Sequence, residues 1–255
     1  MTVKNNLLLG MVCLLGLCGG VARADGVADM RAALGRLQGQ ATVRAVVEAK
    51  TTNRQGEGKE MEEQTGQVSI AIDDSPRGLQ LSYGKDVLAR LETEERAKEK
   101  DAKAKTPTIA AIREVNASEL RPMIFAAANL TRLLERAVFK TEKADTYNGK
   151  PARLLSFETP VEKLTEKERK YVKKFENTLD IWIAADGTPL ASRMRQSISG
   201  RAFVVISFET KNDEDLVYSV TGDRLIVVRK EIKTSGAGAG EKGEMHVIKT
   251  LQLQS

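Results

Sequence analysis

The chain has 255 residues, of which 29% are charged, and its formal net charge at pH 7 is +5. Because this charge is small and both signs are mixed along the whole sequence, it gives no support for nucleic-acid binding. Two cysteines and one histidine exclude a disulfide-stapled fold and a metal site built from histidines, and we expect neither a metal nor a cofactor.

The first 24 residues have the three parts of a secretory signal peptide. Lys4 is the positive start, Leu7–Val21 is an uncharged apolar run, and Ala22-Arg23-Ala24 presents small residues to the peptidase. We expect cleavage after Ala24, a periplasmic product, and a single mature domain over residues 25–255 without a transmembrane span. The alternative is a lipid anchor at Cys18, where the preceding residues partly match a lipobox.

The mature chain begins with a short helix and then changes to strands. Apolar residues at three- and four-residue spacing predict a helix over Val27–Leu37. The period then becomes two, which is typical of half-buried strands. The alternation predicts strands over Thr42–Lys50, Val68–Ile72 and Leu79–Tyr83, with a polar turn at Asn53–Lys59.

A charged helix is predicted over Asp86–Lys105. Acidic residues precede basic residues by four positions along it, and each such pair stabilises a helix by about 0.2–0.5 kcal/mol. Few apolar residues lie on it, so we interpret it as a solvated helix rather than a partner-binding one. Thr106-Pro107-Thr108 should end it.

The most hydrophobic helix is predicted from Asn116 or Ser118 to residue 136, with Glu119 in a capping role. Pro122 is tolerated in a first turn, which favours a start near Ser118. An ordinary core helix explains its broad apolar face. The other interpretation is a lid over an apolar cavity. The residues that would bind the ligand are Met123, Ile124, Ala127, Leu130 and Leu134.

From Ala137 onward the sequence alternates almost throughout. Asn148-Gly149 predicts a hairpin, Thr165–Glu168 a capping box, and Gly200-Arg201 and Lys211–Asp215 two turns. In the last strand Lys249 interrupts an otherwise apolar face. The fold class is therefore α+β, mostly antiparallel β. We expect an unclosed curved sheet or half-barrel of about ten strands, with two to three helices covering one face.

No catalytic residue is predicted, and we expect a protein that is not an enzyme. Gly236–Gly243 is followed by a strand, whereas a phosphate loop needs a strand before it and a helix after it, and the sequence has no Gly-Lys-Ser/Thr there. His246 has no nucleophile motif to serve, and Asn212–Asp215 lacks the ligand spacing of a calcium loop. A carboxylate pair set only by the fold leaves a hydrolase as an alternative. Trp182 should pack at a core face or a cavity mouth, and it joins the candidate ligand-binding residues.

The order of elements, together with the segment Leu179–Leu190, resembles the periplasmic lipoprotein-carrier superfamily (LolA/LolB-like fold). The resemblance implies an unclosed barrel with helices as a lid over an apolar cavity. It also implies a periplasmic, non-enzymatic carrier or chaperone whose partner is a lipid or the acyl chain of a lipoprotein. The alternative is an envelope structural or interaction protein, with a protein partner, a filled core and no small-molecule ligand.

Overall fold

The structure is a computed structural model that describes residues 25–56, 60–202, 206–238 and 241–254. The predicted signal peptide and the alternative anchor Cys18 therefore lie outside the described residues. The strands are β1 Val43–Gln55, β2 Glu62–Ser75, β3 Gly78–Tyr83, β4 Val138–Tyr147, β5 Lys150–Glu158, β6 Val172–Ile183, β7 Pro189–Ala202, β8 Ile206–Thr221, β9 Arg224–Gly238 and β10 Glu241–Leu253.

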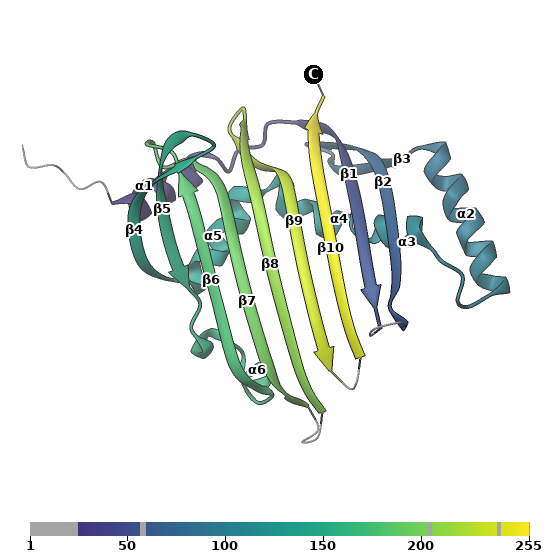
Figure 1. Cartoon of the computed structure of the whole chain (residues 1–255). Coiled ribbons are helices and arrows are strands. Elements are labelled where there is room, and N and C mark those ends of the chain that lie inside the picture. The colour runs from purple at the N-terminus through teal and green to yellow at the C-terminus, as the bar shows by residue number, and fades with distance from the viewer. Residues whose placement is uncertain (1–24, 57–59, 203–205, 239–240, 255) are drawn as a thin grey trace, which may run out of the picture.

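These ten strands form one antiparallel sheet in the order β3-β2-β1-β10-β9-β8-β7-β6-β5-β4. The chain runs as a meander, except that β10 returns to pair with β1. β3 and β4 are the two edges, so the sheet does not close (Figure 1). The prediction of an unclosed antiparallel sheet of about ten strands is confirmed.

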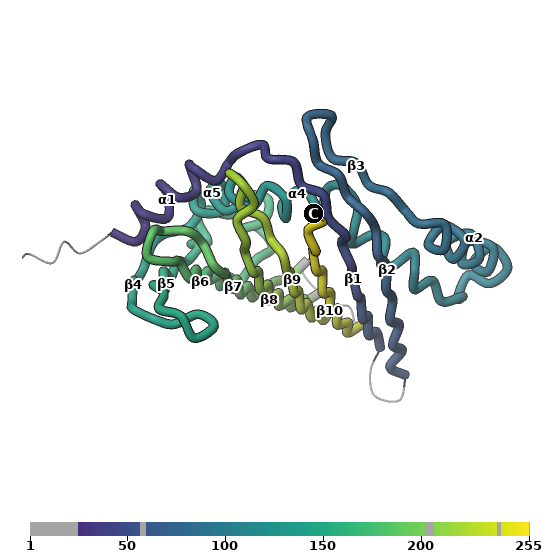
Figure 2. Tube along the Cα trace, turned by 90° about the horizontal axis from the view of Figure 1, so that it is seen from above, coloured from purple at the N-terminus to yellow at the C-terminus, as the bar shows by residue number. Residues whose placement is uncertain are grey.

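The helix count was predicted wrongly, because the described residues contain six α-helices rather than two or three. They are α1 Gly26–Arg36, α2 Lys85–Lys100, α3 Pro107–Arg113, α4 Ala117–Ile124, α5 Ala126–Arg136 and α6 Glu166–Arg169, with a 3-10 helix, η2, at Val161–Lys163. α1, α4 and α5 lie on the same side of the sheet (Figure 2). α2 extends outward beyond β3 (Figure 1).

The single hydrophobic helix expected near residues 118–136 is in fact two helices. Asn116 caps α4, because its side-chain oxygen accepts the N–H of Glu119. Pro122 lies inside α4 rather than in its first turn, and α4 ends two residues later. Phe125 then takes a non-helical conformation, with φ −117° and ψ 49°, before α5 begins. The loss of a backbone donor at proline makes an early helix end understandable.

Two local predictions are confirmed. Asn148 and Gly149 both have positive φ, as a type I′ hairpin requires. The capping box of Thr165 and Glu168 forms at α6.

Two predicted turns are wrong, because strands run through them: β7 continues through Gly200-Arg201 to Ala202, and β8 passes through Lys211–Asp215. Polar residues there are compatible with a strand, because α4 and α5 do not extend over this lower part of the sheet. The turn predicted at Asn53–Lys59 begins later than expected, because β1 extends to Gln55, and residues 57–59 lie outside the described residues.

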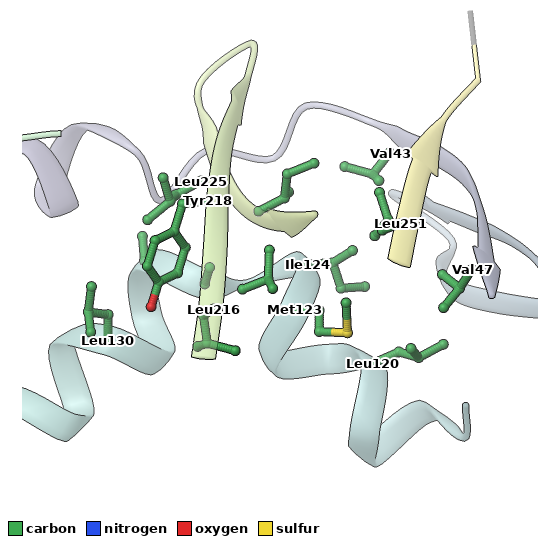
Figure 3. Packing of buried hydrophobic residues seen from close by; sticks show 14 of the residues in the cluster. Val43, Val47, Leu120, Met123, Ile124, Leu130, Leu216, Tyr218, Leu225 and Leu251 are labelled. Carbon is green, nitrogen blue, oxygen red and sulfur yellow. The ribbon is translucent and has the colours of Figure 1, made fainter. Parts of the chain in front are cut away.

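The core lies between the helices and one face of the sheet. Figure 3 shows side chains of α4 and α5 meeting those of β1, β8, β9 and β10. The labelled residues in this packing include Val47, Leu120, Met123, Leu216 and Leu251. The opposite face of the sheet carries mostly polar and charged side chains, such as Arg193 paired with Asp215. We call these two surfaces the helix-side face and the open face.

Candidate functional site

The five predicted lid residues share one environment. Met123, Ile124, Ala127, Leu130 and Leu134 are only 0–7% exposed and belong to the continuous core under α4 and α5. Figure 3 shows Met123, Ile124 and Leu130 among the residues that face the sheet. Hollows of about 490 and 480 Å³ on the described surface are lined by other residues. In this conformation the lid face is packed against the sheet.

Trp182 does not lie with these five residues. Its neighbours in sequence, Ile181 and Ile183, are fully buried on the helix-side face, so Trp182 points to the open face. Its indole N–H donates to Asp145 Oδ2 at 3.0 Å, and its ring packs against that of Tyr147. These contacts connect β6 to β4, and they place Trp182 on the opposite face of the sheet from the five predicted lid residues.

A buried arginine holds the junction between α4 and α5. Arg224 Nη2 donates to the carbonyl oxygen of Ile124 at 3.0 Å. Its Nη1 donates to Asp74 Oδ2 at 2.8 Å and to the carbonyl oxygen of Ala41 at 2.7 Å. Its guanidinium also lies over the ring of Phe125, 4.6 Å from the centroid. One side chain at the start of β9 thus connects the helix junction to the ends of β1 and β2.

A buried lysine forms the second polar connection between helices and sheet. Lys249 is 0% exposed, and its Nζ lies 2.7 Å from Glu119 Oε2 and 3.0 Å from Glu114 Oε2. Lys230, its direct neighbour on β9, pairs with Glu214 at 2.8 Å. Partial burial opposes ionisation of Glu119, but Lys249 outweighs it and lowers the pKa of that carboxyl.

Sequence reasoning missed both connections, although one signal was visible. Lys249 stood out as a charge on an apolar strand face, which predicts a buried partner. Glu119 was assigned to capping, whereas Asn116 is the cap and Glu119 bonds Lys249. Arg224 gave no comparable signal, because it looked like part of a polar turn.

The only histidine lies on the open face in a cluster of charges. His246 Nε2 lies 2.9 Å from Glu231 Oε1, and Lys233 and Arg229 also pair with that carboxylate. Partial burial opposes ionisation of Glu231, but bonds from Lys233, Arg229 and His246 prevail and lower its pKa to about 2. No cluster of three potential metal ligands occurs among the described residues.

Comparison with known proteins does not assign the chain to a family, since no family model and no curated protein matches it. Among the helices of the described residues, none combines the length and apolar character that crossing a bilayer requires. The candidate site is therefore defined by geometry alone: an apolar helix pair, α4 and α5, fixed to the sheet at Arg224 and Lys249.

Proposed function

We propose that this protein is a non-enzymatic carrier or chaperone of the periplasm for an apolar ligand, a lipid or a lipoprotein acyl chain, and that α4 and α5 are its lid. The observation that carries the proposal is the construction of this helix pair. Two short helices meet at a non-helical residue, Phe125, and their polar ties to the sheet are concentrated at Arg224 and Lys249. A pair of this kind can move as a unit, whereas a hydrogen-bonded sheet cannot.

In this proposal the lid occupies the ligand's place when the protein is empty. Leu130 and Ile124 contribute the larger contacts, and burial of each such side chain is worth about 1.5–3 kcal/mol. An acyl chain would replace these contacts as the lid moves away. Binding would then be weak for short chains and stronger for long ones, because each buried CH₂ adds about 0.8 kcal/mol.

The second candidate is an envelope structural or interaction protein with a filled core. The observation that favours it is the nearly complete burial of the five lid residues in one continuous cluster. In that case α4 and α5 would exchange their amide hydrogens only when the whole protein unfolds.

Two measurements on the mature protein separate these candidates. A dansyl-labelled fatty acid should bind saturably, and it should change the rate of amide exchange in α4 and α5 but not in β6 and β7. Exchange of α4 and α5 should also be faster than global unfolding allows in the absence of ligand. No saturable binding, together with exchange of α4 and α5 at the global rate, would leave only the filled-core protein.

A matched pair of truncations adds a second comparison. Leu134→Ala is in the lid, and Leu155→Ala is in the sheet under α1. The carrier should show a several-fold change in fatty-acid affinity for Leu134→Ala only. A filled core predicts a loss of about 2–5 kcal/mol of stability for both.

N-terminal sequencing tests the proposed location in the periplasm. The mature protein should begin at Asp25, and an acylated Cys18 would contradict it.

A further inference from the structure

A row of uncharged polar side chains crosses seven strands on the helix-side face. The strand register makes each member the direct neighbour of the next, from β6 through β7, β8, β9, β10 and β1 to β2. Five carboxamides and one hydroxyl make up the row, and Met245 on β10 completes it. We call the whole row, with Met245 included, the amide band: Asn177, Gln196, Asn212, Thr234, Met245, Asn53 and Gln64.

The amide band is the first row of the sheet beyond the helix layer. In the row directly above it, Leu179 and Val247 are buried and Met194 borders the core, while β8 contributes Glu214, which pairs with Lys230. In the same row a Cβ on Gly66 would lie 2.2 Å from the carbonyl oxygen of Pro107, so α3 rests on β2 there. Figure 1 shows β6 to β10 continuing past α4 and α5 at their lower ends. The band thus borders the core and opens to solvent.

The neutrality of the band does not simply reflect composition. On four of the seven strands, β7 to β10, the open face carries charged or titratable side chains level with the band. They are direct neighbours in the strand register: Arg195, Asp213, Lys233 and His246. Because side chains alternate between faces, each of these residues is one position from a member of the amide band. One face at this level is charged and the other has no charge at all.

Most hydrogen-bonding groups of the band have no side-chain partner within the part of the chain that the structure describes. Among the described residues the one side-chain bond within the band joins the Thr234 hydroxyl, as donor, to Asn212 Oδ1 at 2.8 Å. Asn177 Oδ1 is buried without a hydrogen-bond partner in the described part of the chain. Each carboxamide offers two N–H donors and one carbonyl acceptor. A ligand that both donates and accepts hydrogen bonds, without net charge, matches this chemistry.

We propose that the amide band binds a neutral, hydroxyl-rich chain, an oligosaccharide that lies across the strands. Neighbouring strands place one side chain of the band about every 4.8 Å, polar on every strand except β10 with Met245, and this spacing is close to the hexose repeat of a β-linked glycan. An extended peptide repeats about every 3.3–3.6 Å and falls out of step with the band after a few residues. Phe175 and Ile198, paired in the next row, offer a half-buried apolar surface to the C–H faces of the sugars.

This inference goes beyond the carrier proposal and does not depend on movement of the lid. With α4 and α5 in place the side chains of the band are exposed or half-buried, apart from the buried Oδ1 of Asn177, and the test uses water-soluble sugars without lipid. A carrier without sugar binding, and sugar binding without a carrier, are therefore distinguishable results.

The test is calorimetric titration of the full mature chain with chitohexaose and cellohexaose. We expect saturable binding that stays constant between about 0.05 and about 0.5 M salt, because no charges take part. The comparison ligands are hexagalacturonate, which is charged, and a neutral Gly/Ser/Thr peptide. Both should bind at least about tenfold more weakly, since one brings unpaired carboxylates and the other does not match the repeat.

Matched variants on two neighbouring strands locate the site. Gln196→Ala/Asn212→Ala removes two members of the band and should weaken hexasaccharide binding about tenfold. Arg195→Ala/Asp213→Ala changes the adjacent residues on the open face and should leave it unchanged. A single charge in the band, Gln196→Glu, should weaken binding as well without altering the fold. Absence of binding at millimolar sugar, equal binding of the peptide or hexagalacturonate, or an equal loss in the open-face variant would each overturn the proposal.

Discussion

Replacement of Arg224 by methionine should destabilise the protein more than almost any other single change at a polar residue. The Arg224 side chain is 3% exposed and that of its partner Asp74 is 8% exposed. Methionine would leave the Asp74 carboxylate buried without a counter-charge, and two carbonyl oxygens, of Ala41 and Ile124, without their donor. Removal of one partner from a buried ion pair costs about 3–5 kcal/mol, and we expect Arg224→Met to fall in that range.

A double variant separates the buried charge from the lost hydrogen bonds. Arg224→Met/Asp74→Leu removes both charges and leaves only the two carbonyl oxygens unpaired. Because the cost of the isolated carboxylate disappears, the double variant should be at least about 1 kcal/mol more stable than Arg224→Met alone. The free energy of unfolding is measured by urea titration at neutral pH, followed by far-UV circular dichroism.

Two results would refute this reasoning. If Arg224→Met costs less than about 1 kcal/mol, the guanidinium does not hold the α4–α5 junction in solution. If the costs of Arg224→Met and Asp74→Leu simply add in the double variant, the two charges are not coupled. Amide exchange gives a local check, because loss of the bond to Ile124 should speed exchange in α4 and α5 before the strands are affected.

Two further predictions concern acid stability and the turn beneath α1. The folded state lowers the pKa of Glu231 from 4.5 to about 2, so its ionised carboxylate stabilises the protein above about pH 4.5 and this contribution disappears as the pH falls toward 2. The stability difference between the wild type and Glu231→Gln should therefore shrink across that window in urea titrations, and a constant difference would contradict the assignment. Gly187 and Gly149 both have positive φ, but only at Gly187 would a Cβ meet backbone, 2.3 Å from the carbonyl oxygen of Asp29. Gly149→Ala should cost about 1–2 kcal/mol of backbone strain, and Gly187→Ala should lower the thermal midpoint further because α1 must move; equal midpoints would show that α1 does not press on this turn.

Much of the sheet could be predicted because one buried face imposes a period of two. That alternation predicts the strand positions, and the Asn148-Gly149 pair predicts a hairpin. Together they indicate an antiparallel meander. The same alternation also indicates which face of the sheet Trp182 occupies. Trp182 alternates with Ile181 and Ile183, so the sequence already placed it opposite the core, away from Met123.

Other features could not be read from local patterns. The polar run Lys211–Asp215 resembles a turn, because a strand without a buried face has no apolar period to mark it. Lys249 was a visible exception, but its partners Glu114 and Glu119 lie far away in sequence, and only the packing of α3 and α4 brings them together. The amide band is likewise a property of register across seven strands, and no single segment displays it.

The length of the strands, compared with the width of a helix, explains why the helix layer and the amide band lie on the same face of the sheet. β8 has 16 residues and spans roughly 50 Å, whereas a helix with its side chains is about 10–12 Å across. Helices that cross the strands, as α4 and α5 do in Figure 1, cover only a few rows and leave the rest of the same face to solvent. The row of Leu179 and Met194, with Glu214 as its charged member, therefore lies between the core under the helices and the uncharged amide band. If both proposals hold, their sites adjoin on one face, and the preferred ligand would be an amphiphile with its acyl chain under the lid and a neutral sugar headgroup on the band. Such a glycolipid should bind more tightly than either a fatty acid or a free hexasaccharide, because the two parts would bind as one molecule.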